Sequence, residues 1–363
     1  MVEDVDFGEL AEELERRFRD GGSPWSDESF NAFALRAFAG QFAHVPSYRA
    51  FCEARDRTPA TVERWQDIPA VPARAFAQID FSVAPPERVF LTSGTTRGSA
   101  RRGRHLVPRA SLYEGSLLPP FVTHVLAGVT DAPIPFLSLI PSPEAQPTSS
   151  LSFMVGAAAA ALASATHWVV DGGGMLDEAR LRSVLREATR VGEPLVLLGT
   201  ALALLRCIER LEHHRMDALP PGSRVMETGG FKGLDREIAR AELYDRIAGA
   251  TGVRRDHIVS EYGMTELLSQ LYEPVLSEGA DAAGTHVAPP WLRVRALDPL
   301  TLAEVEPGEV GLLAFFDLAN AGSACHVLTE DVGSVTGGRV RLRGRLQGAE
   351  PRGCSRAMDE LMS

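Results

Sequence analysis

The pattern of apolar and polar positions changes three times along the chain. Over about residues 7–57, apolar side chains recur every three or four positions, which places them on one face of an α-helix. We therefore expect a helical N-terminal region within residues 1–85, ending in a proline-rich connector. The residues with this helical spacing are Leu10, Leu14, Phe18, Phe30, Phe33, Ala34, Ala37 and Phe38.

Short apolar runs alternate with amphipathic stretches over residues 86–290. Strands that alternate with helices predict an α/β fold with a largely parallel sheet. The expected strands are 89–91, 134–140, 167–170, 195–198, 224–227 and 257–260. The expected helices are 111–126, 157–163, 176–191, 201–213 and 235–251.

The pattern of apolar and polar residues changes again after about residue 291. Short β segments at 292–296, 311–316 and 340–342 are separated by turns rich in glycine, proline and aspartate. This pattern predicts a small β-rich subdomain over residues 291–343. We therefore expect one large domain over residues 1–343, composed of the helical region, the α/β core and this subdomain.

Composition removes several classes of function. The 363 residues carry a net charge of −11, which argues against a nucleic-acid-binding face because such a face needs excess Lys and Arg. A membrane span is not expected, because the longest apolar run is interrupted by polar residues. The N-terminus is acidic and does not resemble a signal peptide. The four cysteines form no CxxC pair, so a reducing, cytoplasmic setting fits best.

The strongest local signal is the run Thr92-Ser93-Gly94-Thr95-Thr96, which follows a predicted strand. Glycine lets backbone N–H groups turn toward an anion, and hydroxyl groups add donors. After a strand, such a loop is expected at the carboxyl edge of the sheet, where phosphate sites form. It is not a Walker A loop, because the GKS/T ending is absent. Taken alone, a plain hydroxyl-rich turn explains it equally well.

A second run, Tyr262-Gly263-Met264-Thr265-Glu266, also follows a predicted strand. The Tyr262 ring can stack on a base and the Thr265 hydroxyl can donate to a phosphate. The Glu266 carboxylate suits Mg²⁺, which prefers hard oxygen ligands. The alternative is that Thr265 merely opens a helix, with Glu266 near its positive end.

Three further motifs are weaker on their own. Gly229 and Gly230, after Thr228, permit close approach of the backbone to a flat ligand, or they form a tight turn. Asp331, expected at the end of a strand, can accept from both hydroxyls of a ribose, or it belongs to an ordinary aspartate turn. Arg345, beside a glycine-rich turn, can bridge a phosphate or lie in solvent.

In order and spacing, these motifs resemble those of the ANL adenylating superfamily, which includes acyl-CoA synthetases, peptide-synthetase adenylation domains and luciferases. The resemblance covers about residues 89–355, and within the superfamily the chain is most similar to the acyl-protein synthetase (LuxE-like, long-chain-fatty-acid–protein ligase) family. That similarity lies in residues 317–323, 329–333 and 352–355. It implies an ANL-type adenylation domain whose C-terminal lid is truncated or absent, with residues 344–363 as a short remnant of hinge and lid.

The resemblance also implies roles for individual residues, with ATP and Mg²⁺ as cofactors. The residues implied in nucleotide binding are Thr92, Ser93, Gly94, Thr95 and Thr96 at the phosphates, Gly229, Gly230, Tyr262 and Gly263 at adenine, and Asp331 at the ribose. The residues implied in catalysis are Thr265 at the α-phosphate, Glu266 as the Mg²⁺ ligand, Arg345 at the hinge, and Cys354.

The implied reaction is ATP-dependent activation of a carboxylic acid, expected to be a fatty acid, to acyl-AMP with release of pyrophosphate. The acyl group then passes to a thiol. Cys354 is our candidate, because Arg352 and Arg356 would lower its pKa; a structural cysteine is an equal alternative, and Cys325 is the second choice. The expected final acceptor is a partner such as an acyl-CoA or fatty-acid reductase or a carrier protein.

Two departures from the superfamily pattern keep other functions open. The usual loop lysine is missing and four arginines follow the loop instead, which are either phosphate ligands or solvated side chains. The lid lysine also has no counterpart. The alternatives are an acyl-AMP-dependent CoA, carrier-protein or amide ligase, and a non-catalytic nucleotide- or acyl-binding homologue.

Overall fold

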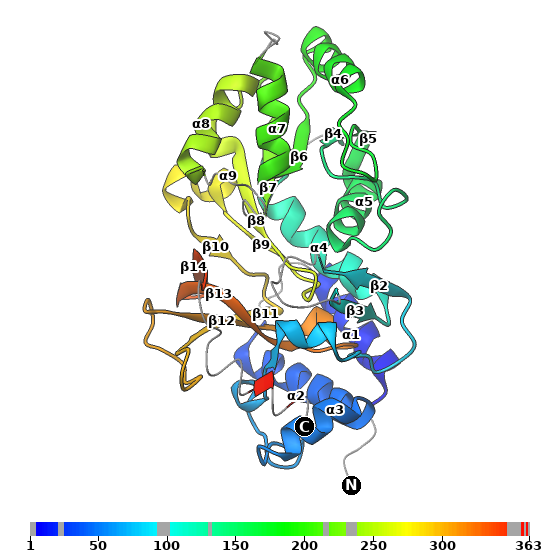
Figure 1. Cartoon of the computed structure of the whole chain (residues 1–363), viewed down its shortest axis with the longest axis vertical. Coiled ribbons are helices and arrows are strands. Elements are labelled where there is room, and N and C mark those ends of the chain that lie inside the picture. The colour runs from blue at the N-terminus through cyan, green and yellow to red at the C-terminus, as the bar shows by residue number, and fades with distance from the viewer. Residues whose placement is uncertain are drawn as a thin grey trace. The chain divides into compact units, whose positions relative to one another are not determined.

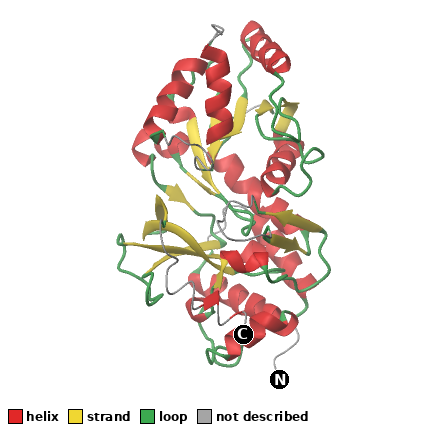
Figure 2. Ribbon diagram, viewed as in Figure 1, coloured by secondary structure: helices red, strands yellow, loops and turns green. Residues whose placement is uncertain are grey.

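The computed structural model describes residues 5–20, 25–92, 102–129, 133–212, 218–229, 238–346, 357–358 and 361 (Figures 1 and 2). The chain divides into two compact units. The first unit comprises Met1–Pro119, Met264–Gln270 and Val287–Ser363, and the second comprises Pro120–Gly263 and Leu271–His286. The division expected after residues 85, 290 and 343 runs in chain order and stays a prediction.

Three helices begin the first unit, and they confirm the predicted helical region. The first two helices start after Asp6 and Ser26, whose side chains accept hydrogen bonds from backbone N–H groups of the first turn. Pro46 opens the third helix, where its missing N–H has no intrahelical partner to lose. These helices are α1 (Phe7–Arg19), α2 (Asp27–His44) and α3 (Pro46–Glu53).

The main sheet of the first unit is antiparallel and contains one strand that is much longer than its sequence pattern suggests. β13 is 11 residues long and its pairing with β14 shifts register between Val332 and Gly333. Such a shift interrupts the alternation by which a strand is identified in sequence. In order, the strands are β11 (Leu292–Leu297), β12 (Val310–Asp317), β13 (His326–Thr336) and β14 (Arg339–Arg345), with β1 (Val71–Pro72) parallel to β13.

The strands before and after the expected phosphate loop form a separate two-stranded sheet. β2 (Arg88–Leu91) pairs antiparallel with β3 (Arg104–Val107), so the loop between them is the connection of a β-hairpin. The expectation that this loop leaves the carboxyl edge of the parallel sheet is therefore wrong. β3 was not predicted, because it begins with the polar residues Arg104 and His105 and so contains no clear apolar run.

The second unit contains the predicted parallel sheet. β4, β6, β7 and β8 are parallel neighbours, β5 is parallel to β4 at one edge, and β9 is antiparallel to β8. The strand expected at 167–170 lies earlier in the chain, as β5. The strands are β4 (Ile134–Ser138), β5 (Ala163–Trp168), β6 (Val196–Thr200), β7 (Arg224–Thr228), β8 (Ile258–Tyr262) and β9 (Leu271–Tyr272).

Helices cover the strands of this sheet (Figure 1). Leu197, Val225 and Ile258 of the strands belong to one buried apolar cluster with Leu181 and Leu243 of the helices. The boundary between the units at Pro119 falls within α4 (Ala110–His124). The other helices are α5 (Ser150–Leu162), α6 (Glu178–Val191), α7 (Ala201–Glu212), α8 (Arg240–Thr251) and α9 (Val275–Glu278).

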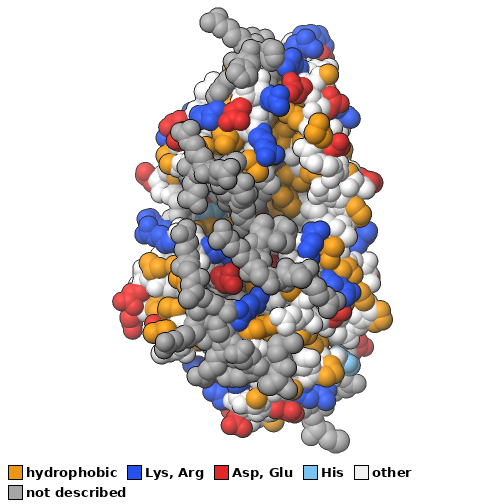
Figure 3. Space-filling model, in the orientation of Figure 1, with side chains coloured by type: hydrophobic (Ala, Val, Ile, Leu, Met, Phe, Trp, Pro, Cys, Tyr) orange, Lys and Arg blue, Asp and Glu red, His pale blue; other side chains and the backbone are white. Residues whose placement is uncertain are grey.

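The surface mixes charge types. On the described part of the face in Figure 3, arginine side chains are interspersed with aspartate and glutamate. Exposed apolar side chains such as Met175 and Leu300 are separate in sequence and belong to different units. None of the helices in the described ranges combines the length and apolar character needed to cross a bilayer.

Aromatic rings form much of the core of the first unit. The ring of Phe30, on α2, is fully buried, and its centroid lies 5.5 Å from that of Trp65 and 5.8 Å from that of Phe316 on β12. The guanidinium carbon of Arg293 lies 4.6 Å from the Phe30 ring centroid. Phe30 thus joins the helical layer to the antiparallel sheet.

His326, beside this aromatic core, is buried in a neutral form. Its Nδ1 lies 2.7 Å from the carbonyl oxygen of Ile68, which can only accept, so Nδ1 carries the hydrogen. Burial lowers the pKa of His326 to about 3. In the unfolded chain the same imidazole titrates near pH 6.5.

Replacing Phe30 with alanine should lower the unfolding free energy by roughly 3–5 kcal/mol, because the lost ring leaves a cavity between the helices and the sheet. Leu300→Ala, at a side chain that is 65% exposed, is the control and should change it by less than about 0.5 kcal/mol. Urea denaturation measures both. Equal costs for the two variants would contradict this description of the core.

Replacing His326 with asparagine should reduce the loss of stability in acid. The native imidazole resists protonation while the unfolded one accepts a proton, so wild-type stability falls as the pH drops from 6.5 toward 3. Relative to His326→Asn, which does not titrate, the wild type should lose up to about 1.4 kcal/mol per pH unit in that window. Urea denaturation at several pH values measures the difference, and parallel curves would contradict it.

Candidate functional site

The residues expected to form the site are divided between the two units. Those in the second unit are Gly229, Tyr262 and Gly263, and those in the first are Thr92, Thr265, Glu266, Asp331 and Arg345. The expected residues that lie outside the described part of the chain are Ser93, Gly94, Thr95, Thr96, Gly230 and Cys354.

In the second unit, the two expected adenine-binding segments end neighbouring strands. β7 and β8 are parallel, and Thr228 is the register partner of Glu261. Gly229 follows with φ +75°, a left-handed conformation that favours glycine. Tyr262 ends β8 and is partly exposed. The sheet therefore brings Gly229 and Tyr262 to the same edge, as expected for the carboxyl ends of parallel strands.

Two buried carboxyl groups lie directly beneath these strand ends, and the sequence motifs did not include them. Thr228 donates a hydrogen bond through Oγ1 to Oε2 of Glu261. Glu227 accepts from the hydroxyl of Tyr244, at 3.2 Å, and from that of Ser260, at 3.4 Å. Burial raises the pKa of Glu227 to about 7 and that of Glu261 to about 8. Their only sequence signal is an acidic residue at the end of each apolar strand.

An ion pair completes this polar cluster. Arg240 of α8 contacts both carboxylate oxygens of the fully buried Glu273, each at 2.6 Å. His286 Nε2 lies 3.3 Å from Ser260 Oγ, and burial lowers the pKa of this histidine to about 3. The strand ends of the second unit therefore rest on a cluster of buried polar groups.

In the first unit, Thr265 and Glu266 belong to the irregular segment Met264–Gln270. Both side chains are partly exposed, and a turn rather than a helix forms here. The helix-opening interpretation of Thr265 and Glu266 is therefore wrong. Buried side chains hold the backbone: His105 Nδ1 lies 2.6 Å from the Thr265 carbonyl oxygen, and Asn320 Nδ2 donates to the Glu266 carbonyl oxygen at 2.7 Å.

The same segment is held at its other end. Asp317 accepts hydrogen bonds from the backbone N–H groups of Leu268 and Ser269, at 3.0 and 2.9 Å, and from the Ser269 hydroxyl. Ser116 Oγ donates to the carbonyl oxygen of Leu268 at 2.7 Å. Burial raises the pKa of Asp317, and the hydrogen bonds it accepts act in the opposite direction.

Thr92 is the last described residue before the loop that connects β2 and β3. Its Oγ1 accepts from the N–H of Gly103 at 2.8 Å, so the hydroxyl hydrogen can still donate. A Cβ on Gly103 would lie 2.8 Å from Thr92 Cγ2, which explains the glycine. Arg102 donates to the carbonyl oxygens of Thr92 and Leu91, and Arg104 pairs with Asp80 at 3.1 Å. These two arginines therefore make protein contacts, whereas Arg97 and Arg101 lie outside the described residues.

Asp331 and Arg345 lie together on adjacent strands. They are register partners in β13 and β14, with Arg345 Nε 3.6 Å from Asp331 Oδ1 and 3.5 Å from Glu330 Oε2. Asp331 lies inside β13, so the expectation that it ends a strand is wrong. The expected ribose ligand and the expected hinge arginine thus form one charged pair at the end of β14.

The three described cysteines are buried thiols. Burial raises the pKa of Cys52 and of Cys207 to about 12 each, and that of Cys325 further still. Gln41 Nε2 lies 3.1 Å from Cys325 Sγ. A raised pKa keeps the thiol protonated and unreactive, so the structure argues against Cys325 as a nucleophile.

The described residues contain no cluster of three or more His, Cys, Asp or Glu side chains that could hold a metal ion. Mg²⁺ does not require one, because it usually binds to one or two carboxylates together with water and substrate phosphates. Glu266, partly exposed on a fixed backbone, fits that type of site.

Comparisons with known proteins agree with these observations. The family model for acyl-protein synthetase, LuxE, matches residues 24–363. The chain is 35% identical over 79 residues to the long-chain-fatty-acid–luciferin-component ligase of Aliivibrio fischeri, covering 19% of this chain and 21% of that protein. It is 24% identical over 201 residues to the ligase of that name from Vibrio harveyi, covering 51% and 50%. The chain thus spans half or less of the length of these curated relatives.

A solved structure of 2-hydroxyisobutyryl-CoA ligase, in complex with 2-HIB-AMP and CoA, has a similar fold. It matches with a TM-score of 0.66 at 14% identity, over 96% of this chain and 71% of that one. This likeness concerns the fold, and it confirms the expected α/β, ANL-type architecture. Since the family model covers most of the sequence, the chain belongs to the acyl-protein synthetase family, LuxE.

Proposed function

We propose that the protein uses ATP to activate a fatty acid as acyl-AMP. Membership of the acyl-protein synthetase family supports this proposal. The observation that carries it is the backbone of Thr265 and Glu266, which two buried side chains hold in an irregular turn. Fixing two partly exposed polar residues in this way serves a reaction in which positioning and charge neutralisation provide most of the catalysis.

In the first step, a carboxylate oxygen of the acid attacks the α-phosphorus of ATP. An O–P bond forms, the bond to the β-phosphate oxygen breaks, and pyrophosphate leaves. The Thr265 hydroxyl donates to the α-phosphate, and Glu266 holds Mg²⁺, which supplies positive charge at the phosphates. The hydroxyls and N–H groups of Thr92, Ser93, Gly94, Thr95 and Thr96 bind the phosphates.

The nucleoside is bound by the strand ends. Tyr262 packs on adenine, and Gly263, Gly229 and Gly230 lie beside it. Asp331 accepts hydrogen bonds from the ribose hydroxyls. Arg345, whose Nε lies 3.6 Å from Asp331 Oδ1, links that carboxylate to the hinge.

In the second step, a thiolate attacks the acyl carbon of the mixed anhydride. A C–S bond forms, the C–O bond to AMP breaks, and AMP leaves. Cys354 provides the thiol, and the structure supports it indirectly: the other three cysteines are buried and their pKa values are raised. The thioester then passes to a partner, a fatty-acid or acyl-CoA reductase or a carrier protein, in a cytoplasmic setting.

Acid-dependent exchange between pyrophosphate and ATP tests the first step. Across a panel of carboxylic acids of increasing length, the wild type should catalyse exchange. Glu266→Gln should reduce the rate roughly 100-fold, because a neutral amide holds Mg²⁺ poorly. The control, Glu309→Gln, removes the same charge from an exposed turn and should exchange like the wild type. Absence of exchange in the wild type with every acid would refute the proposal.

Labelling with ATP and a radioactive fatty acid tests the second step. The wild type should retain label that hydroxylamine releases, as expected for a thioester. Cys354→Ser should lose the label while it still exchanges pyrophosphate, and Cys207→Ser should keep it. Adenylation without any protein-bound label would instead favour transfer to CoA, a carrier protein or an amine.

A further inference from the structure

The backbone groups of the segment Met264–Gln270 are satisfied mainly by side chains rather than by secondary structure. It forms neither strand nor helix, and the internal backbone hydrogen bond that it makes runs from the N–H of Leu267 to the carbonyl of Met264. Buried backbone groups without such partners are costly unless side chains supply them. Here the partners come from residues as much as 160 positions away.

These partners divide by the part of the segment that they hold. Asp317 and Ser116 contact Leu268 and Ser269, at the buried end. His105 and Asn320 contact the carbonyl groups of Thr265 and Glu266. This second pair is hydrogen-bonded directly to the two residues that we assign to the α-phosphate and Mg²⁺.

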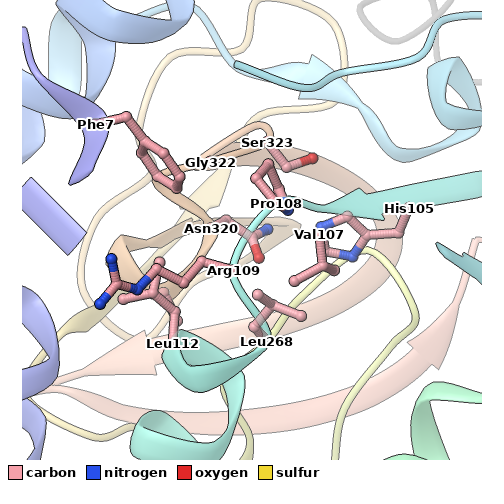
Figure 4. Close-up of a pocket in the computed structure, with 11 residues that line it drawn as sticks. Phe7, His105, Val107, Pro108, Arg109, Leu112, Leu268, Asn320, Gly322 and Ser323 are labelled. Atoms are coloured by element: carbon pink, nitrogen blue, oxygen red, sulfur yellow. The ribbon is translucent and has the colours of Figure 1, made fainter. Parts of the chain in front are cut away.

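His105 is fixed and has no other polar partner among the described residues. Its ring is fully buried on β3, edge-on to Phe76 with a centroid distance of 5.5 Å. Nδ1 must carry the hydrogen, because the carbonyl of Thr265 can only accept. Nε2 has no hydrogen-bond partner among the described residues, and the ring lines a recess with Val107 and Leu112 (Figure 4).

Asn320 is fixed in turn by its own neighbours. It ends a short 3₁₀ helix, Leu318–Asn320, and lines the same recess (Figure 4). Its Nδ2 donates to the carbonyl oxygens of Glu266 and Ala324, at 2.7 and 3.1 Å. Gln41 of α2 donates to the Asn320 carbonyl at 3.3 Å. Two elements distant in sequence from Glu266, α2 and this 3₁₀ helix, thus fix the position of the Glu266 carbonyl group.

We propose that His105 and Asn320 are positioning residues for adenylation, which hold the Thr265 and Glu266 backbone so that the hydroxyl and the carboxylate are already directed at the nucleotide and its metal. This inference rests on the proposed function. A displacement of about 1 Å in such groups costs about 100-fold in rate. Outer-shell partners of a metal ligand typically contribute 10- to 100-fold.

The chain offers a matched control for each residue. His326 has the same arrangement as His105, with a buried ring and Nδ1 hydrogen-bonded to a backbone carbonyl, but its carbonyl belongs to Ile68. Asn31 donates from Nδ2 to the carbonyl of Glu63 at 2.8 Å, as Asn320 does to Glu266, although Asn31 is partly exposed and Asn320 is buried. A purely structural role therefore predicts similar activity per folded molecule within each pair.

The experiment compares His105→Leu with His326→Leu, and Asn320→Ala with Asn31→Ala, in the full chain. At saturating ATP and acid, His105→Leu and Asn320→Ala should lower pyrophosphate exchange at least about tenfold and raise the Mg²⁺ concentration for half-maximal rate. The controls should retain the wild-type values per folded molecule. His105→Asn, which replaces Nδ1–H with an amide donor, should recover most of the rate.

Hydrogen–deuterium exchange, read by mass spectrometry without ligand, gives a measure that does not depend on activity. The peptide containing residues 264–270 should exchange faster in His105→Leu or Asn320→Ala than in the controls. Exchange equal to that of the controls, or equal activity losses within each pair, would overturn the positioning role. If the wild type lacks acid-dependent pyrophosphate exchange, the proposed function fails, and the deuterium result still decides whether these residues hold the segment.

Discussion

The first unit depends on a set of buried side-chain hydrogen bonds that replace secondary structure. The carboxylate of Asp317 accepts from the backbone of Leu268, Ser269 and Ala319 and from the Ser269 hydroxyl. Burying an isolated carboxylate is expensive, and four donors offset that cost. Removing Asp317 would leave several buried N–H groups without partners at once. The irregular course of Met264–Gln270 is therefore set by this network of buried side chains.

In the second unit, regular strands rather than side-chain hydrogen bonds position the expected site residues. Parallel pairing of β7 and β8 places Gly229 and Tyr262 at one edge without any special side chain. The polar groups lie beneath instead, where burial keeps Glu261 protonated in part near neutral pH, with a pKa of about 8. Thr228 can then hydrogen-bond to a neutral carboxyl group rather than to a buried charge. Here the parallel strands position the residues at their ends, and the buried Glu261 carboxyl group of β8 is hydrogen-bonded to Thr228 of β7.

Elements that depend on residues close together in the sequence were predicted correctly, whereas features that depend on distant residues were not. Helices such as α2 and parallel strands such as β7 were predicted because their apolar periodicity is local. The hairpin of β2 and β3, the full length of β13 and the position of Asp331 within it were not predicted, because pairing between strands and a register shift leave little local pattern. The chemistry-bearing motifs were found individually. The contacts that fix them, between His105 and Thr265 or Asn320 and Glu266, join residues 160 and 54 positions apart.

Two of the four arginines after Thr96 make contacts that bear on which cations neutralise phosphate in the proposed adenylation. The missing loop lysine suggested that the arginines after Thr96 replace it. Arg102, however, donates to backbone carbonyls of β2 and the residue after it, and Arg104 is paired with Asp80. An arginine that leaves such contacts to bind phosphate must break them, which weakens its net contribution. Arg102 and Arg104 are therefore weaker candidates for phosphate ligands than the sequence alone suggests. Mg²⁺ at Glu266 would then provide much of the neutralisation, which is consistent with how firmly the backbone at Glu266 is held.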